Sequence, residues 1–315
     1  MKNFGLIGAA GYIAPRHMQA IAETGNALVA AIDPRDSVGV LDGYFPQAKF
    51  FTEIERFDRY LEKLRRERHK ERVQYLSICS PSYLHDAHVR LALRLDAHAI
   101  CEKPLVISPW NVDALRELEA ERDCRVYTVL QLRVLPALVA LEERLAAQPE
   151  RKRARVRLTY ITPRGPWYHV SWKGQDQKSG GIALNIGVHF FDLLLWLFGG
   201  AHAARVHLAS PARMSGTLEL EHADVQWFLS VEKADMPLGQ LAAGRSAFRS
   251  LSIDDEEIEF SDGFGDLHTR VYRDILSGRG TGLDAARPAI ELVHRIRHSD
   301  VIPPDGSSHP LLQRA

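Results

Sequence analysis

The chain has 315 residues, a length that favours two domains and a core large enough to fold without disulfides or a structural metal. Its 40 lysines and arginines are balanced by 40 aspartates and glutamates, which argues against a nucleic-acid partner, because binding phosphates normally requires a basic excess. Three cysteines without C-x-x-C spacing, no apolar run as long as a membrane span and no signal peptide predict a cytoplasmic protein without a membrane partner.

The first 130 residues alternate short apolar runs with longer helical patterns, the first of them a helix at 13–23. Continuous apolar runs are typical of a sheet covered on both faces, and their alternation with helices is typical of parallel strands joined by crossovers. The sequence therefore predicts an α/β protein with an N-terminal Rossmann-type, doubly wound parallel sheet. The strands are expected at 4–8, 28–33, 73–79, 97–101 and 125–130.

A charged helix is expected at 57–72, where apolar residues follow i, i+3, i+4, i+7 spacing from Phe57. Its basic residues could form a binding patch. Glutamates alternate with them, however, and this mixture favours a solvated helix face.

From Arg153 onward the pattern changes to apolar and polar residues in alternation, which is typical of an antiparallel sheet with one wet face. We expect a Rossmann domain over 1–130 and, over 131–315, an α+β domain with a largely antiparallel open sheet. The strands of the second domain are expected at 156–161, 216–231, 248–253 and 257–260, and its helices at 185–198, 267–276 and 285–297.

A glycine loop joins the first expected strand to the first helix, at the position where a Rossmann fold binds the phosphates of a dinucleotide. Gly8 permits a tight turn, and Gly11 lets a pyrophosphate approach the backbone near the helix N-terminus. The spacing is G-x-x-G-x-x-A rather than G-x-G-x-x-G, so the loop alone also fits a plain strand–helix turn.

Asp33 strengthens the dinucleotide interpretation. It lies 22 residues after Gly11 at the end of the second apolar run, where an acid can hydrogen-bond ribose hydroxyls. A carboxylate there repels a 2′-phosphate and favours NAD, although Arg35, two residues later, leaves NADP open as an alternative.

Two further motifs follow strands of the expected parallel sheet, at the edge where open α/β sheets bind ligands. In Glu102-Lys103-Pro104 the proline disfavours helix for Lys103 and holds its ammonium at the strand tip; the alternative is a surface lysine in a turn. Ser80-Pro81 ends the preceding strand in the same way, and His85 after it is either a ligand contact or a packing histidine.

The helix expected at 185–198 carries Asn185, His189 and Asp192 at i, i+4 and i+7, a polar stripe on an otherwise apolar segment. A lone histidine on an apolar helix is commonly a core residue, but the stripe beside a double glycine favours a functional His189. A metal is not expected, because no third ligand has a useful spacing.

With these motifs the chain resembles the Gfo/Idh/MocA family of sugar oxidoreductases. The matching residues are the glycine loop with His17 after it, Ser80-Pro81-x-x-x-His85, Glu102-Lys103-Pro104, Gln131 and the segment 180–192. A narrower resemblance, carried by 159–168, 171–174 and 185–190, is to bacterial UDP-N-acetyl-2-amino-2-deoxy-D-glucuronate dehydrogenases. Asn185, where many relatives have aspartate, supports that branch, whereas Ala10 looks inserted relative to the commoner glycine loop.

The resemblance implies NAD-dependent oxidation of the sugar 3-hydroxyl of that UDP-linked uronate to a ketone, in the biosynthesis of surface polysaccharide such as lipopolysaccharide. It implies that Lys103 and His189 flank the reacting hydroxyl, either of them as base, with Asn185 orienting the substrate or His189. The residues implied to contact NAD are Gly8, Gly11, Tyr12, Ile13, Asp33, Ser80, Pro81, His85, Glu102, Lys103 and Gln131. Those implied to contact the substrate are Arg16, Lys103, Gln131, Arg164, Tyr168, Trp172, Lys173, Lys178, Asn185 and His189.

The resemblance further implies a homo-oligomer, a dimer of dimers, and 2-oxoglutarate as the compound with which some relatives regenerate NAD. Three alternatives stay open on the sequence alone. They are a dehydrogenase of a free polyol such as an inositol, a catalytically silent NAD-binding regulator and a structural scaffold.

Overall fold

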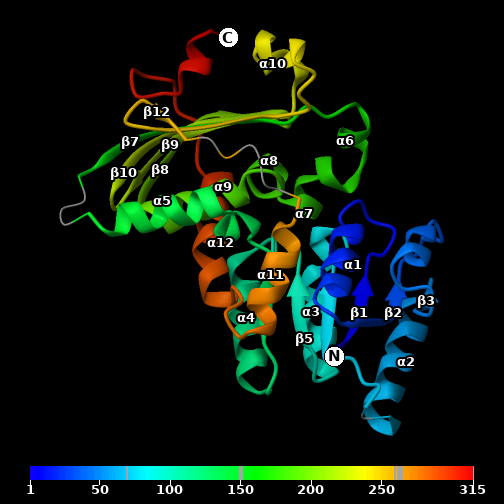
Figure 1. Cartoon of the computed structure of the whole chain (residues 1–315). Helices are drawn as coiled ribbons and strands as arrows, with labels where there is room; N and C mark the ends of the chain where they lie inside the picture. Colours follow the sequence, from blue (N-terminus) through cyan, green and yellow to red (C-terminus); the bar gives the residue numbers. More distant parts are fainter. Residues whose placement is uncertain (69, 149–151, 259, 261–264, 315) are drawn as a thin grey trace. The chain divides into compact units, whose positions relative to one another are not determined.

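The computed structural model describes residues 1–68, 70–148, 152–258, 260 and 265–314, which fold into two compact units (Figure 1). The first unit comprises Met1–Val134 and Gly265–Arg287, and the second comprises Leu135–Phe264 and Pro288–Ala315. The first unit therefore differs from the single continuous segment that we expected. The reason is that helix α11 (Leu267–Leu276) packs against α1 (Ala14–Glu23) and contributes Tyr272 to the same apolar core.

A six-stranded parallel sheet in the order β3-β2-β1-β4-β5-β6 forms the centre of the first unit and confirms the Rossmann prediction. The strand order reverses between β1 and β4, so a crevice is expected at the carboxyl ends of these two strands. The short strand β3 was not expected, because its three residues are exposed or only partly buried and form no continuous apolar run. The strands are β1 Asn3–Ile7, β2 Ala27–Ile32, β3 Lys49–Phe51, β4 Tyr75–Ile78, β5 His98–Cys101 and β6 Val126–Thr128.

The helices of the first unit bury one face each against this sheet or a neighbouring helix. The charged helix α2 begins at Ile54 and ends at Glu67, and it buries Phe57, Leu61 and Leu64. Its basic residues pair with glutamates, as in the bonds from Arg65 and Arg66 to Glu62, which confirms a solvated face rather than a binding patch. The remaining helices are α1, α3 His85–Arg94, α4 Pro109–Ala120, α11 and the first residues of α12 Leu283–Arg297.

The second unit contains a mixed sheet in the order β12-β11-β7-β10-β9-β8, whose neighbouring strands are antiparallel except for β7 and β10. This confirms the largely antiparallel sheet. The region expected as one strand at 216–231 is two strands joined by a turn, and β8 was not expected. The strands are β7 Ala154–Ile161, β8 Ala201–Ala209, β9 Arg213–Leu220, β10 Ala223–Ser230, β11 Phe248–Ile253 and β12 Glu256–Glu257.

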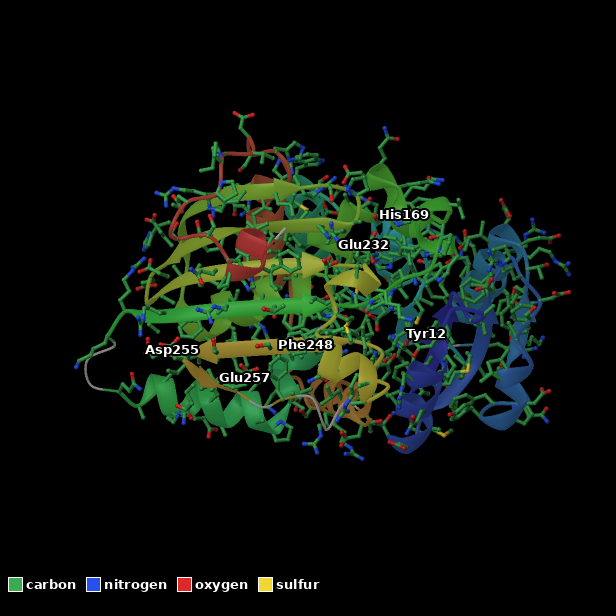
Figure 2. All side chains as sticks on the ribbon, turned by 90° about the horizontal axis from the view of Figure 1, so that it is seen from above. Tyr12, His169, Glu232, Phe248, Asp255 and Glu257 are labelled. Atoms are coloured by element: carbon green, nitrogen blue, oxygen red, sulfur yellow. The ribbon has the colours of Figure 1, made fainter. Side chains whose placement is uncertain are left out.

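Helices cover both faces of this second sheet. Helices α5 (Pro136–Ala146) and α9 (Val188–Phe198) lie on one face, and α10 (Leu238–Ala242) lies on the other with the C-terminal segment (Figure 1). On that second face Phe228 stacks with His309, whose Nε2 lies 3.0 Å from the Thr159 hydroxyl. Phe248 lies on β11 and Glu257 on the neighbouring edge strand β12 (Figure 2). The short helices of this unit are α6 Trp167–Val170, α7 Asp176–Ser179 and α8 Gly181–Asn185.

Within the described residues no single helix is long and apolar enough to cross a membrane. One bent pair passes by length and composition alone, namely Asp176–Asn185 followed by Val188–Phe198, with a bend of 46°. Most of α9 is buried, as expected for a core helix.

Candidate active site

The glycine loop between β1 and α1 forms the tight turn that a pyrophosphate site requires. Gly8 has a φ of +88°, and a Cβ at this position would lie 2.7 Å from the carbonyl group of Cys79. The Gly8 N–H donates to the Ile32 carbonyl at 2.9 Å, and the Gly11 N–H donates to the Gly8 carbonyl at 3.0 Å. The loop is therefore closed on itself and tied to β2, and glycine is needed at its first position.

The start of α1 has few N–H groups to offer a phosphate. Ala14 and Arg16 already donate to the preceding turn, and Pro15 has no N–H. The N–H groups of Gly8, Ala9, Ala10 and Gly11 also donate within the protein, so a phosphate contact through backbone N–H groups would fall to Tyr12 and Ile13. The Tyr12 side chain is 95% exposed (Figure 2). Ile13 is partly buried at the N-cap.

Asp33 follows β2, and its carboxylate binds the backbone of the loop after β1 and of the turn after β2. Its Oδ2 accepts the Ala10 N–H at 3.0 Å, and its Oδ1 accepts the Arg35 N–H at 2.9 Å. A carboxylate has about four lone-pair sites, so two remain for other donors such as ribose hydroxyls. The residue that looked inserted in the sequence, Ala10, is thus the one that Asp33 ties down.

His85 joins the ends of two neighbouring strands. Its Nδ1 lies 2.7 Å from the Pro104 carbonyl and its Nε2 lies 2.8 Å from the Ser80 carbonyl, while the Ser80 hydroxyl contacts His88 Nδ1 at 2.8 Å. Burial lowers the pKa of His85, and the hydrogen bonds to Pro104 and Ser80 offset part of that effect. The ring therefore bridges backbone groups, and its contact with a cofactor stays a prediction, as does that of Pro81.

Glu102, at the carboxyl end of β5, is the acceptor in a buried group of histidines. Its Oε1 lies 3.0 Å from His17 Nε2 on α1 and 2.9 Å from His268 Nε2 on α11. Burial alone would raise the pKa of Glu102, but the hydrogen bonds from His17 and His268 outweigh it and hold the pKa well below its usual range. Its other oxygen, Oε2, accepts the Lys103 N–H at 3.2 Å.

The group of His17, Glu102 and His268 was missed in the sequence, because no local motif contains His268. Histidine and carboxylate are residue types that bind metals, and these three ligand atoms lie within 4.8 Å of one another. The two contacts to Glu102 have the length of direct hydrogen bonds, so we describe the group as a hydrogen-bonded network.

The three remaining candidates of the first unit differ in exposure. Lys103 is partly exposed, and its peptide bond to Pro104 is cis. Gln131 begins a 3-10 helix, and its Oε1 is buried with no hydrogen-bond partner among the residues that the structure describes. Arg16 is exposed and donates from Nη1 to the Gly265 carbonyl at 2.8 Å. The buried acceptor of Gln131 is the group that most needs an external donor.

In the second unit the polar stripe does not lie on one helix, and that prediction is wrong. Asn185 ends α8, whereas His189 and Asp192 belong to α9, and the chain bends between them. The bend contains Gly187, where a Cβ would lie 2.6 Å from both the Ala183 carbonyl oxygen and a Leu229 methyl group. Asn185 and His189 remain partly exposed, whereas Asp192 is buried.

Cationic and aromatic side chains gather between Arg164 and Lys173, also within the second unit. The Lys173 ammonium lies 5.8 Å from the centre of the Trp172 ring, and burial, followed by the neighbouring Arg164, lowers its pKa. Tyr168 is 1% exposed, and its hydroxyl has no hydrogen-bond partner within the described part of the chain. Burial raises the pKa of Tyr168 to about 12, so the hydroxyl stays a donor. Lys178 lies on α7 and is exposed.

The sheet order, the Gly8 turn and the acid at the end of β2 define the class of the first unit as a dinucleotide-binding Rossmann domain. Comparison with known proteins gives the family. Residues 2–130 match the model of the oxidoreductase family with an NAD-binding Rossmann fold, and residues 152–236 match that family's C-terminal alpha/beta domain. The chain belongs to the Gfo/Idh/MocA oxidoreductases, which confirms the resemblance read from the motifs, with NAD as the family's cofactor.

Solved structures extend the likeness over both units. The chain is 52% identical to the WlbA (WbpB) dehydrogenase from Thermus thermophilus in complex with NAD and UDP-GlcNAcA, over 98% of this chain and 99% of that one, with a TM-score of 0.94. The same dehydrogenase has been solved with NAD and alpha-ketoglutarate, at 51% identity. The WlbA dehydrogenase from Bordetella pertussis shares 19% identity over 96% of this chain and 99% of its own, with a TM-score of 0.76, which shows the common fold.

Curated relatives match less of the chain. An uncharacterized oxidoreductase of Synechocystis sp. is 27% identical over 142 residues, which are 44% of this chain. The matched part spans only 38% of the length of that relative.

Proposed function

We propose that this chain is an NAD-dependent dehydrogenase that oxidises the sugar 3-hydroxyl of UDP-N-acetyl-2-amino-2-deoxy-D-glucuronate, abbreviated UDP-GlcNAcA, to the ketone. The observation that carries the proposal is the 52% identity over nearly the whole chain to a dehydrogenase crystallised with NAD and this nucleotide sugar. That likeness covers 98% of the chain and therefore extends over both units. A role in surface-polysaccharide biosynthesis and a cytoplasmic location are part of the proposal, the latter supported by three unpaired cysteines.

Oxidation of a secondary alcohol requires the removal of a hydride from carbon and of a proton from oxygen. NAD accepts the hydride when it is bound. Either His189 or Lys103 acts as the base that takes the hydroxyl proton. His189 suits this role, since an imidazole titrates near neutral pH. Lys103 otherwise stabilises the oxygen as negative charge develops on it, and Asn185 orients the substrate or His189.

Residues of the first unit supply the cofactor contacts in this proposal. Gly8 and Gly11 let the pyrophosphate approach the loop, with Tyr12 and Ile13 beside it. The two lone-pair sites of Asp33 that the backbone does not use accept the ribose hydroxyls. The residues expected to complete the contacts at the neighbouring strand ends are Ser80, Pro81, His85, Glu102, Lys103 and Gln131.

The anionic groups of the substrate require cations, and the second unit supplies them close together. Arg164 and Lys173 repel each other, which is consistent with the lowered pKa of Lys173, and the buried Tyr168 hydroxyl lacks a partner within the described residues. A carboxylate or phosphate bound here would relieve the repulsion and accept the hydroxyl proton in a hydrogen bond. Trp172 offers a ring face to sugar or base, and Lys178 and Arg16 are further candidates for the diphosphate.

The direct test is to incubate the purified chain and NAD with each of three compounds and follow the absorbance of reduced nicotinamide. The compounds are UDP-GlcNAcA, its non-oxidised analogue UDP-N-acetylglucosamine and free inositol. Reduction of NAD with UDP-GlcNAcA, and with neither of the other two compounds, supports the proposal. Reduction with inositol instead identifies a polyol dehydrogenase, and no reduction with any of them favours a regulator.

The regeneration of NAD is a separate part of the proposal. The 51% identical Thermus thermophilus dehydrogenase was solved with alpha-ketoglutarate, which supports 2-oxoglutarate as the compound that accepts the hydride back from NADH. Adding 2-oxoglutarate should then turn a single turnover of bound NAD into repeated turnover.

We also propose a homo-oligomer, a dimer of dimers. Light scattering of the purified protein should then give the mass of four chains.

A further inference from the structure

Three histidines surround the Glu102-Lys103-Pro104 turn, and each comes from a different helix of the first unit. His17 on α1 and His268 on α11 bind Glu102 Oε1, and His85 on α3 binds the Pro104 carbonyl. All three are buried, with the exposed fraction of each at or below 7%. Lys103 lies between Glu102 and Pro104, the two residues that these hydrogen bonds hold.

The hydrogen-bonded chain behind His17 fixes which atom donates at each step. His17 Nδ1 lies 2.7 Å from the Tyr272 hydroxyl, which lies 2.6 Å from the Ser77 hydroxyl. Glu102 is ionised and can only accept, so His17 Nε2 carries the proton that it donates. Neutral His17 then accepts from Tyr272 at Nδ1, and Tyr272 accepts from Ser77.

The ionisation states agree with this direction of donation. Burial lowers the pKa of His17, which keeps its ring neutral, and burial raises the pKa of Tyr272 well above its usual value, which keeps its hydroxyl a donor. The other titratable groups that interact with Glu102 are His268, His85, Cys79 and Cys101. Each polar atom in this series of hydrogen bonds is therefore either a donor or an acceptor, and the carboxylate of Glu102 has little freedom to rotate.

We propose that His17, His268 and His85 are positioning residues for Lys103. His17 and His268 hold the Glu102 carboxylate, whose Oε2 accepts the Lys103 N–H at 3.2 Å, and His85 holds the Pro104 carbonyl on the other side. The backbone on both sides of Lys103 is thus fixed to three helices. The inference rests on the proposed function, in which the Lys103 ammonium acts on the reacting oxygen.

Stability alone does not account for this buried arrangement of one carboxylate and its hydrogen-bond donors. A buried carboxylate with its donors is often no more stable than apolar residues of similar volume in the same space. A carboxylate does offer a second oxygen that binds the next residue's N–H, which an apolar side chain cannot do. The geometry therefore indicates that precise placement of Lys103 is what the buried charge achieves.

The test compares His268→Leu with the conservative His268→Gln, whose side-chain N–H can still donate to Glu102. With NAD and UDP-GlcNAcA, His268→Leu should lower kcat about tenfold, as expected for one lost hydrogen bond to a charged group, and leave both KM values within about twofold. His268→Gln should recover most of kcat. His85→Leu should also lower kcat through Pro104, and its KM for NAD should rise as well, because His85 is a proposed cofactor contact.

Ile275→Ala is the matched control, because Ile275 is a buried residue of α11 that belongs to the apolar core. It should lower the melting temperature and leave kcat per folded molecule unchanged. Wild-type kcat in His268→Leu or His85→Leu overturns the role of that histidine. An equal loss in His268→Gln or in Ile275→Ala overturns the inference as a whole, because the effect is then general destabilisation.

Hydrogen exchange at the Lys103 amide separates this inference from the proposed function. The exchange needs no substrate, so it reports on the anchor even if the wild-type protein oxidises none of the tested compounds. His268→Leu should accelerate the exchange of this amide about tenfold, whereas Ile275→Ala should leave it within about twofold of the wild type once global unfolding is subtracted. Unchanged exchange in His268→Leu refutes the anchor, and absent turnover in the wild type refutes only the proposed function.

Discussion

Replacing Asp33 by asparagine separates the two tasks that this carboxylate performs. The side chain keeps its shape, but one of its two oxygens becomes an NH2 group. Both oxygens accept a backbone N–H, from Ala10 at 3.0 Å and from Arg35 at 2.9 Å. One of these donors must therefore face another donor in the variant, so one hydrogen bond is lost and the other is no longer charge-assisted.

The expected size follows from the bond that is lost. A hydrogen bond to a charged group contributes about 1.5–3 kcal/mol, so the free energy of unfolding should fall by about 2 kcal/mol. A similar loss on the ribose hydroxyls weakens NAD binding about 30-fold, since each 1.4 kcal/mol is about a factor of ten. Binding of NADP should weaken much less, because the variant no longer repels the 2′-phosphate.

The assay is calorimetric titration of Asp33→Asn with NAD and with NADP, beside urea unfolding without cofactor. Asp36→Asn is the matched control, because Asp36 is an exposed aspartate three residues along the chain. It should change neither the preference for NAD over NADP nor the stability. A loss of stability in Asp33→Asn with an unchanged preference would refute the ribose contact and leave Asp33 as a residue that only ties the loop.

Three further predictions concern other parts of the chain. Lys103→Ala and His189→Ala should each lower kcat by about 10²-fold or more in the nicotinamide assay, and near-normal turnover in either variant excludes that residue from proton transfer. Arg164→Ala should raise KM for UDP-GlcNAcA far more than the dissociation constant of UDP-N-acetylglucosamine; equal losses would assign the arginine to the diphosphate. Burial lowers the pKa of His309 to about 4, so its contribution to stability is complete above about pH 6.5 and falls as the pH falls. Urea unfolding should then show that His309→Phe loses up to about 2–3 kcal/mol less than the wild type between pH 7 and about pH 4.5, and parallel losses would contradict the assignment.

The elements that the sequence predicted well are those whose burial is local and continuous. The runs at 28–33 and 97–101 are apolar because both faces of the parallel sheet are covered, and the bounds of β2 and β5 match these runs to within one residue. Strand β8 was missed because its burial is incomplete and irregular, so its sequence shows no clear period of two. The strand expected at 216–231 contains a turn at Glu221 and His222, which lack the glycine, proline or asparagine that usually marks one.

The bend before α9 shows why helical spacing misplaced a site residue. Asn185 and His189 are four residues apart, but Gly187 lets the chain bend where the Leu229 methyl group and the Ala183 carbonyl approach it closely. That approach is a contact with a strand more than 40 residues away in the sequence, so spacing within the segment carries no trace of it. The residue types in this segment were informative, whereas the prediction that they share one helix face was wrong.

Contacts that are distant in the sequence also explain why the surroundings of Glu102 could not be predicted. Its place after an apolar run predicted a strand tip, and the structure has it at the end of β5. Its partners are His17, 85 residues before it on α1, and His268, 166 residues after it on α11. Helix α11 belongs to the first unit only because the chain returns to that unit. Periodicity predicted α11 as a helix but could not show that its first turn carries a donor for Glu102. A histidine at the start of an amphipathic helix is ordinary in a sequence, and only the return of the chain makes His268 part of the surroundings of Lys103.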